Sequence, residues 1–245
     1  MSLAEALLEV ARSDERAVLF TVLEGPERGR KLLVRPERGE TLGGGPAGLA
    51  ALADDVRRSS VIDFGGVPVF ADVYGRPPRL VVVGAVDTGE ALCAGARALG
   101  WHTVCVDARA RFATPERVPS AEEIVVAWPD EAFAKLALDR DTAVVVLTHD
   151  DKFDVPALAA ALRSDAFYVG ALGSRVAQAN RRDRLLEAGL TLEELAGLHG
   201  PAGLDIGAES PAETAVSILA EALAALSGRG GGPLRQSAER IHAER

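Results

Sequence analysis

Residues able to bind a ligand gather at four places in the sequence, each directly after an apolar run. The apolar runs are residues 79–83, 103–106, 143–147 and 166–169. The candidate binding residues that follow them are Gly84, Ala85, Asp87, Thr88, Asp107, Arg109, Thr148, His149, Asp150, Gly170, Gly173, Ser174 and Arg175. Glycine backbone and arginine suit phosphate, carboxylates accept hydrogen bonds from hydroxyl groups, and histidine can move a proton. The set indicates ligand binding more clearly than catalysis.

The first group forms an incomplete dinucleotide-binding fingerprint. An apolar strand that breaks at Gly84 and continues as a helix from Thr88 is typical of a parallel strand followed by its crossover helix. Asp107 lies 23 residues after Gly84, about where such folds place the carboxylate that meets a ribose hydroxyl. The middle glycine of the pattern is replaced by Val86, which disfavours ordinary binding of NAD.

The third and fourth groups each allow two interpretations. His149 could hydrogen-bond a ligand or shuttle a proton, or it could be a solvated loop residue while Asp150 caps a turn. Ser174 and Arg175, after the flexible turn at Gly173, suit a phosphate at a helix N-terminus. The alternative for this pair is an ordinary helix cap beside an exposed arginine.

Two glycine-rich segments add further candidates. The segment 199–208 is too apolar for an arbitrary loop and is expected to fold back on the sheet edge, with Asp205 facing the site or satisfying backbone amides. Gly44 and Gly45 lie in a glycine run before Pro46, where the backbone can approach a ligand closely. The alternative for this run is a plain tight turn between a strand and a helix.

Catalytic and metal-binding patterns do not emerge from the sequence. No Ser-His-Asp or Cys-His grouping can be assembled, and no pair of carboxylates stands out as acid and base. Cys93 and Cys105 lack metal-ligand spacing and are expected to pack as small apolar residues, so a zinc site is not supported.

Composition places the chain among ordinary globular proteins. Its 245 residues are 48% hydrophobic and 26% charged, which is enough for one large domain or two smaller ones. The net charge of -9 argues against nucleic acid as a main partner. With no apolar run of membrane-spanning length and no signal segment, a cytoplasmic protein is the default expectation.

The order of elements predicts an α/β fold in two parts. A small α+β domain over residues 1–75 would contain a helix at 2–12, strands at 17–23 and 31–34, a helix at 47–57, and two strand pieces within 61–74. After a linker at 75–78, a Rossmann-like parallel sheet with helices on both faces is expected over 79–227, followed by a flexible tail at 228–245. Capping boxes at Thr191 and Ser210 predict the starts of two of its helices.

Five segments taken together closely resemble the XdhC/CoxI family. They are Leu147-Thr148-His149-Asp150, the run from Asp165 to Arg175, His199-Gly200-Pro201, the run from Gly203 to Ala208, and the run from Pro211 to Ile218. The resemblance covers about residues 79–226. It implies a Rossmann-like C-terminal domain in a maturation factor for xanthine dehydrogenase or carbon monoxide dehydrogenase. Such a factor would bind molybdenum cofactor, protect it during sulfuration and deliver it to an apo molybdenum hydroxylase, acting as a chaperone rather than by turnover.

The chain departs from the family pattern at two places. Where the family usually carries Gly-Gly-Cys, this chain has Gly43-Gly44-Gly45-Pro46, and a second Cys-Gly-Gly element is matched by Phe64-Gly65-Gly66. The family's Gly-Ala-Gly-His turn is here Gly84-Ala85-Val86-Asp87. The chain is therefore a divergent member by this resemblance.

Three functions remain open from the sequence. The first is a molybdenum-cofactor insertion factor with its site between the small domain and the strand ends, in which Ser174 and Arg175 hold phosphate and Asp107 meets a ribose or pterin donor. Its partners would be an apo molybdenum hydroxylase and a cysteine desulfurase, and a homodimer is compatible with it. The others are an NAD(P)-dependent oxidoreductase, and an assembly or regulatory protein that has lost its ligand.

Overall fold

The computed structural model describes residues 1–13 and 15–236, and the chain separates into two compact units. The N-terminal unit contains residues 1–76 with 232–236, and the Rossmann unit is Pro77–Gly231. The change of unit falls within the expected linker at 75–78. Of the tail expected at 228–245, residues 228–231 belong to the Rossmann unit and Leu234–Gln236 form a 3-10 turn, while 237–245 lie outside the described residues.

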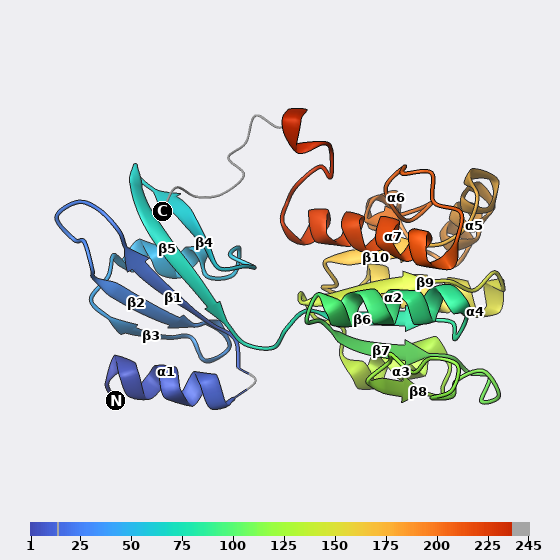
Figure 1. Ribbon diagram of the computed structural model, residues 1–245, viewed down its shortest axis with the longest axis horizontal. Helices are drawn as coiled ribbons and strands as arrows, with labels where there is room; N and C mark the ends of the chain where they lie inside the picture. The colour runs from blue at the N-terminus through green and yellow to red at the C-terminus, as the bar shows by residue number, and fades with distance from the viewer. Residues whose placement is uncertain (14, 237–245) are drawn as a thin grey trace. The chain divides into compact units, whose positions relative to one another are not determined.

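The N-terminal unit is an antiparallel sheet with a helix on one face (Figure 1). Its strands, in the order β3-β2-β1-β5-β4, are β1 (Ala17–Val22), β2 (Lys31–Arg35), β3 (Glu40–Gly43), β4 (Ser60–Phe64) and β5 (Val67–Tyr74). Because side chains alternate across a strand, Val18 and Phe20 face one hydrophobic core, and Ala17 and Leu19 face another beneath helix α1 (Leu3–Arg12).

The helix expected at 47–57 is present but shorter than expected, and it is of the 3-10 type. Residues Ala47–Leu52 form a 3-10 helix, closed by hydrogen bonds such as the one from the Leu49 N–H to the Pro46 carbonyl. Gly48 packs so closely on the Phe64 ring that an added Cβ would lie 2.9 Å from it. A glycine this near the start weakens helix propensity, so the segment follows the sheet surface rather than its local α-helical preference.

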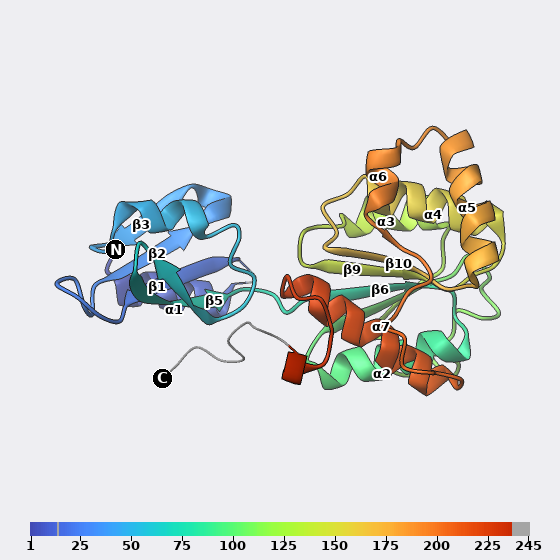
Figure 2. The same cartoon turned by 90° about the horizontal axis from the view of Figure 1, so that it is seen from above.

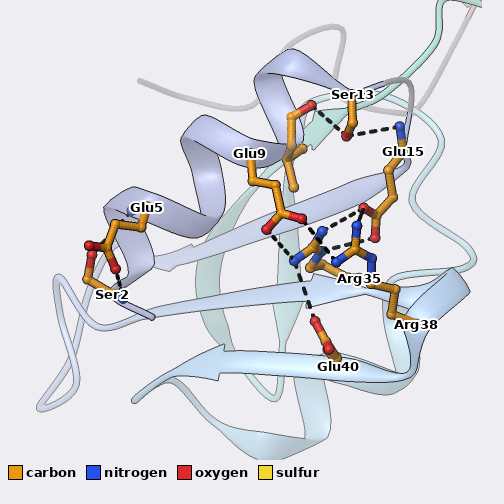
Figure 3. Close-up of polar contacts among 9 residues, drawn as sticks. Ser2, Glu5, Glu9, Ser13, Glu15, Arg35, Arg38 and Glu40 are labelled. Carbon is orange, nitrogen blue, oxygen red and sulfur yellow. Dashed lines mark hydrogen bonds and ion pairs between the residues drawn. The ribbon is translucent and has the colours of Figure 1, made fainter.

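A buried arginine ties the first helix region to the sheet (Figure 3). Arg35 on β2 has no exposed surface, and its guanidinium binds both carboxylate oxygens of Glu15, with Nε–Oε1 at 3.0 Å and Nη2–Oε2 at 2.6 Å. Glu9 and Glu40 contact the same group, and Arg38 pairs with Glu9 and Glu15. The hydrogen bonds from Arg35 lower the pKa of Glu15 below its ordinary value, which keeps this network ionised.

The Rossmann unit is a six-stranded, fully parallel sheet in the order β11-β10-β9-β6-β7-β8. The strands are β6 (Arg79–Val83), β7 (His102–Val106), β8 (Glu123–Val125), β9 (Thr142–Val146), β10 (Tyr168–Ala171) and β11 (Leu198–His199). Its central strands are continuous apolar runs because both faces of the sheet are covered. The predicted Rossmann-like α/β fold is confirmed.

The helices divide between the two faces of this sheet (Figure 2). Helices α2 (Asp87–Ala98) and α7 (Pro211–Leu226) cover one face, and their buried residues share one core. The other face carries α3 (Pro129–Leu136), α4 (Asp151–Leu162), α5 (Arg175–Glu187) and α6 (Leu192–Ala196). The capping boxes predicted at Thr191 and Ser210 are both present.

Two boundaries in this unit differ from the expectations, and one strand is additional. The helix that the apolar pattern of the sequence predicts over residues 155–162 begins earlier, at Asp151, because Asp150 caps it and its first turn is polar. Strand β10 lies two residues later than expected, since pairing with β9 continues through Ala171. The short strand β11 was not expected at all. A two-residue strand has no periodicity to reveal it.

The strand order reverses between β6 and β9, which defines where a ligand is expected. The chain runs outward from β6 through β7 to β8 and then returns to place β9 on the other side of β6. In such sheets the carboxyl ends at the reversal point form the usual ligand crevice. None of the described helices is long and apolar enough to cross a membrane.

Candidate functional site

The glycine turn after β6 lies at the reversal point. Gly84 has a φ of +116°, which L side chains rarely adopt, and a Cβ there would lie 3.2 Å from Cγ2 of Thr148 on the neighbouring connection. A Cβ on Gly89 would lie 2.6 Å from the Gly84 carbonyl oxygen. Gly84 and Gly89, the first and third glycines of the fingerprint, therefore allow the turn to pack closely against its neighbours and against α2. Val86 is the N-cap residue of α2.

Asp107 supports this turn from the end of β7. Its Oδ2 accepts from the Ala85 N–H at 2.9 Å, and its Oδ1 accepts from the Arg109 N–H at 2.9 Å. The Arg109 side chain adds two bonds, Nε–Oδ1 at 2.8 Å and Nη2–Oδ2 at 2.7 Å. A carboxylate has about four lone-pair positions. In this arrangement they are all used within the protein, so Asp107 holds Ala85 and Arg109 in place and offers no free acceptor to a ribose.

The charge state of Asp107 follows from these contacts. Burial raises the pKa of Asp107, but the Arg109 side chain and the backbone N–H groups of Ala85 and Arg109 outweigh it and hold the pKa below its ordinary value. Arg109 also lies over the Phe112 ring, 4.5 Å from its centroid. The guanidinium is thus fixed on two sides, and part of its side chain remains exposed at the strand ends.

Thr148 belongs to a buried polar chain that the sequence did not reveal. Its hydroxyl donates to Asp154 of α4, whose other oxygen lies 2.9 Å from Nη2 of Arg181 on α5. Arg181 also donates to the Leu172 carbonyl at 3.1 Å and to Oε1 of Gln178 at 2.6 Å. The sequence showed only a threonine after a strand, Thr148, and an aspartate in the first turn of the next helix, Asp154. This combination is too common to predict a buried polar chain.

His149 and Asp150 lie exposed beside this chain. Asp150 caps α4 by accepting from the Lys152 N–H at 3.3 Å, and its carboxylate pairs with the Lys152 ammonium at 3.1 Å. Asp150 is therefore a helix-capping residue, which was one of the two interpretations of the sequence. A ligand contact by His149 stays a prediction.

The residues after β10 separate into a packing part and an exposed part. Gly170 is inside the strand and faces the Tyr168 ring, 2.7 Å from a would-be Cβ, while Gly173 turns the chain with a φ of +139°. Ser174 caps α5 by accepting from the Ala177 N–H at 3.2 Å. Arg175 is exposed and lines a cavity of about 280 Å³ beside α5. Phosphate binding at Ser174 and Arg175 stays a prediction.

The segment 199–208 folds back on the sheet edge, as expected. The Gly203 N–H donates to Glu221 of α7 at 2.7 Å, and the same Oε2 accepts from the Tyr168 hydroxyl at 2.6 Å. His199 pairs with the other Glu221 oxygen at 3.2 Å and packs its ring on Tyr168. Asp205 is exposed, and a ligand contact by its carboxylate stays a prediction.

Gly44 and Gly45 belong to the N-terminal unit, where both N–H groups donate to the Lys31 carbonyl at 2.9 and 3.1 Å. This geometry agrees with the alternative that the glycine run is a plain tight turn. A shared site with the strand ends of the Rossmann unit stays a prediction. The four strand-end groups, in contrast, lie along one edge of one sheet.

Both cysteines are fully buried, as expected from the sequence. Burial raises the pKa of Cys105 to about 12 and raises that of Cys93 as well. Such thiols stay protonated near neutral pH, and the thiolate is the form that binds metals and acts as a nucleophile. No cluster of metal-ligating side chains occurs among residues 1–13 and 15–236.

The profile of the XdhC Rossmann domain matches residues 80–222. The chain belongs to the XdhC Rossmann domain family. This confirms the resemblance drawn from the five sequence segments. The matched range runs from β6 into α7, so it contains the glycine turn, the Asp107–Arg109 pair and the Thr148–Asp154–Arg181 chain.

Two curated relatives share part of this chain. A Bacillus subtilis protein named as a probable xanthine dehydrogenase component is 32% identical over 144 residues, covering 59% of this chain and 42% of the relative. The molybdenum cofactor insertion chaperone PaoD of Escherichia coli is 39% identical over 90 residues, covering 37% of this chain and 28% of PaoD. The chain thus spans less than half the length of both curated relatives.

A solved structure resembles nearly the whole chain. It is described as a xanthine dehydrogenase from Bacillus halodurans, with a TM-score of 0.68 and 25% identity over 93% of this chain and 68% of that one. The likeness therefore extends beyond the XdhC Rossmann domain into the N-terminal unit.

Proposed function

We propose that this protein binds molybdenum cofactor and delivers it to an apo molybdenum hydroxylase of the xanthine or carbon monoxide dehydrogenase type. Membership of the XdhC Rossmann domain family supports this, as does the relative PaoD, which is named as a molybdenum cofactor insertion chaperone. The protein acts as a carrier, and the chemistry of the bound group serves the client enzyme. Its cytoplasmic location, a sulfur-supplying cysteine desulfurase partner and a homodimer belong to the same proposal.

The observation that carries the proposal is the arrangement of the carboxyl edge of the sheet. A glycine turn held by Asp107 lies at the reversal point, and the exposed Arg175 lines a cavity two strands away along the same edge. Fixed backbone turns and a guanidinium suit an anionic, phosphate-bearing ligand. Arg175 and Ser174 would hold the phosphate, with His149 contacting the rest of the ligand.

The residues fit the organic, anionic part of the cofactor better than its metal end. Both thiols are buried and protonated, so this chain offers no thiolate to the metal. Binding in this divergent member therefore relies on phosphate and ring contacts. Asp107 takes part indirectly, because its lone pairs position Arg109 and the glycine turn.

The geometry favours this reading over an NAD(P)-dependent oxidoreductase. Dinucleotide enzymes use the carboxylate after the second strand to accept from the ribose. Here Asp107 is engaged by Arg109 and backbone instead, and Val86 occupies the position of the glycine that approaches a pyrophosphate.

Calorimetric titration with molybdenum cofactor, and in parallel with NAD and NADP, tests the proposal. We expect saturable binding of the cofactor and none of the dinucleotides. Binding of NAD alone would establish the oxidoreductase alternative. Binding of none of the three would leave the assembly role, which a pull-down of the client enzyme would then examine.

Replacing Arg175 with Ala tests the phosphate contact within this site. Because Arg175 is exposed, its loss should weaken cofactor binding by about tenfold and leave thermal unfolding unchanged. Arg163→Ala provides the control, since Arg163 is also exposed but pairs with Glu194. Equal affinity of wild type and R175A would remove the phosphate contact from the proposal.

A further inference from the structure

A cavity of about 280 Å³ lies between α5 on one side and α6 with the edge strand β11 on the other. One wall is a single stripe of α5, because Arg175, Gln178 and Arg182 follow one another at helical spacing. Leu195, Leu198 and Gly200 form the opposite wall. The volume is just below the ~300–1,000 Å³ range of small-molecule sites, so the cavity suits a compact ligand.

The two arginines of the cavity differ from the other arginines of the same helix. Arg181 pairs with Asp154, and Arg184 pairs with Asp151. The guanidinium groups of Arg175 and Arg182 form no ion pair or hydrogen bond within residues 1–13 and 15–236. In a chain of net charge -9, acidic partners are abundant. Two like charges that share one cavity repel each other, and an anion between them would relieve this repulsion.

The remaining lining residues restrict what kind of anion fits. Gln178 is held in place, with Nε2 donating to the Ala171 carbonyl at 2.9 Å and Oε1 accepting from Arg181 at 2.6 Å. Each polar end of its side chain is therefore engaged once, which fixes the amide, and Nε2 keeps a second N–H that can donate to an anion. Half-buried Leu198 and the small accessible part of Leu195 give the opposite wall an apolar surface.

The geometry points to this cavity as a binding site for a phosphate monoester, in which Arg175 and Arg182 clamp the phosphate and the ester's organic part lies on Leu195 and Leu198. The inference adds Arg182 and the leucine wall to the phosphate contact of the proposed function, and it rests on that function only for the identity of the natural ligand. The phosphate-bearing side chain of a cofactor is one source of such a group, and free phosphate is another.

Titration of the full chain with phenyl phosphate and with inorganic phosphate, followed by calorimetry at low salt, tests the site. We expect saturable binding of phenyl phosphate that is tighter than binding of inorganic phosphate. Arg182→Gln should weaken it by about tenfold or more, because one of two charge-assisted contacts is lost. Arg184→Gln is the matched control, since it removes the same charge from the same helix outside the cavity.

Each outcome decides the inference. Loss of binding in R182Q with wild-type binding in R184Q supports the site. Equal losses in both variants would indicate a diffuse charge effect and overturn it, as would wild-type affinity in R182Q or no binding by the wild type. Equal affinity for phenyl phosphate and inorganic phosphate would refute the contact of the ester's organic part with Leu195 and Leu198. If phenyl phosphate binds but molybdenum cofactor does not, the proposed function fails while the site stands.

Discussion

Asp107 shows how one buried carboxylate organises the carboxyl edge of the Rossmann unit. It joins the turn after β6, through Ala85, to the segment after β7, through Arg109. Both contacts are charge-assisted, and the carboxylate is nearly inaccessible at 4% exposure. The residue therefore determines where the turn and the guanidinium lie, whichever ligand binds beside them.

Asp107→Asn tests this role. The amide keeps the shape but loses the charge and one acceptor, so we expect the free energy of unfolding to fall by about 2 kcal/mol. Urea denaturation at neutral pH measures it. Asp205→Asn is the control, because Asp205 is exposed and should change stability by less than about 0.5 kcal/mol. A wild-type midpoint for D107N would show that the contacts contribute no net stability.

The same carboxylate predicts a pH dependence. The pKa of Asp107 in the folded protein is lowered. Its contribution to the free energy of unfolding is therefore fully present above the unfolded-state pKa of about 3.9, and it is lost as the pH falls through the folded-state pKa. The stability difference between wild type and D107N should therefore be largest near neutral pH and shrink in acid below the unfolded value. A difference that grows in acid would contradict the assigned sign.

At the scale of elements, the Thr148–Asp154–Arg181 chain fastens α4 and α5 to the end of β9. Asp154 and Arg181 are 2% and 5% exposed, so neither charge can be solvated if its partner is removed. The chain also reaches the carbonyl of Leu172, which leads into the Gly173 turn. The chain thus links the turn that precedes α5 and Arg175 to the buried pair.

Arg181→Met should destabilise the protein by about 3–5 kcal/mol, because it leaves the Asp154 charge buried and unpaired. Thermal and urea unfolding measure the loss. Arg184→Met on the same helix removes an exposed pair with Asp151 and should cost less than about 1 kcal/mol. Adding Asp154→Leu to R181M should recover part of the stability. No recovery in the double variant would show that the loss came from packing alone.

At the scale of the whole molecule, the two units have separate hydrophobic cores. The clusters on the two faces of the N-terminal sheet contain only residues between 3 and 74, and those of the Rossmann unit only residues between 80 and 226. The unit boundary at residues 76 and 77 thus lies between complete cores. A unit with its own core can in principle fold alone.

A fragment of residues 77–231 is therefore expected to unfold in one cooperative transition and to keep the phenyl phosphate affinity of the full chain. Calorimetric unfolding and the titration described above measure both. The fragment carrying R181M serves as a control, since it should unfold at a lower temperature. A fragment without a cooperative transition would show that the N-terminal unit stabilises the Rossmann unit.

Much of the architecture could be predicted because its causes are local. The continuous Val and Leu runs of β6 and β9 indicate strands buried on both faces, and Gly84 ends the first of them. The caps of α6 and α7 were found from Thr191 and Ser210 because a capping box spans only four residues. Errors arose where neighbours override local preference, as at residues 47–57, or where a strand such as β11 is too short to show a period.

The sequence by itself determined the parallel α/β fold, the glycine turn and the strand ends at which polar residues gather, because periodicity, turns and caps depend on residues close together in the chain. Only the tertiary structure decided how the charges pair. Asp107 could have faced a ligand, but Arg109 and the Ala85 N–H occupy its oxygens. Among the arginines of α5, the structure engages Arg181 and Arg184 and leaves Arg175 and Arg182 facing a cavity. The physical reason is that an ion pair depends on which elements the strand order brings together. The arginines of α5 carry the same guanidinium group, so only their tertiary neighbours distinguish them.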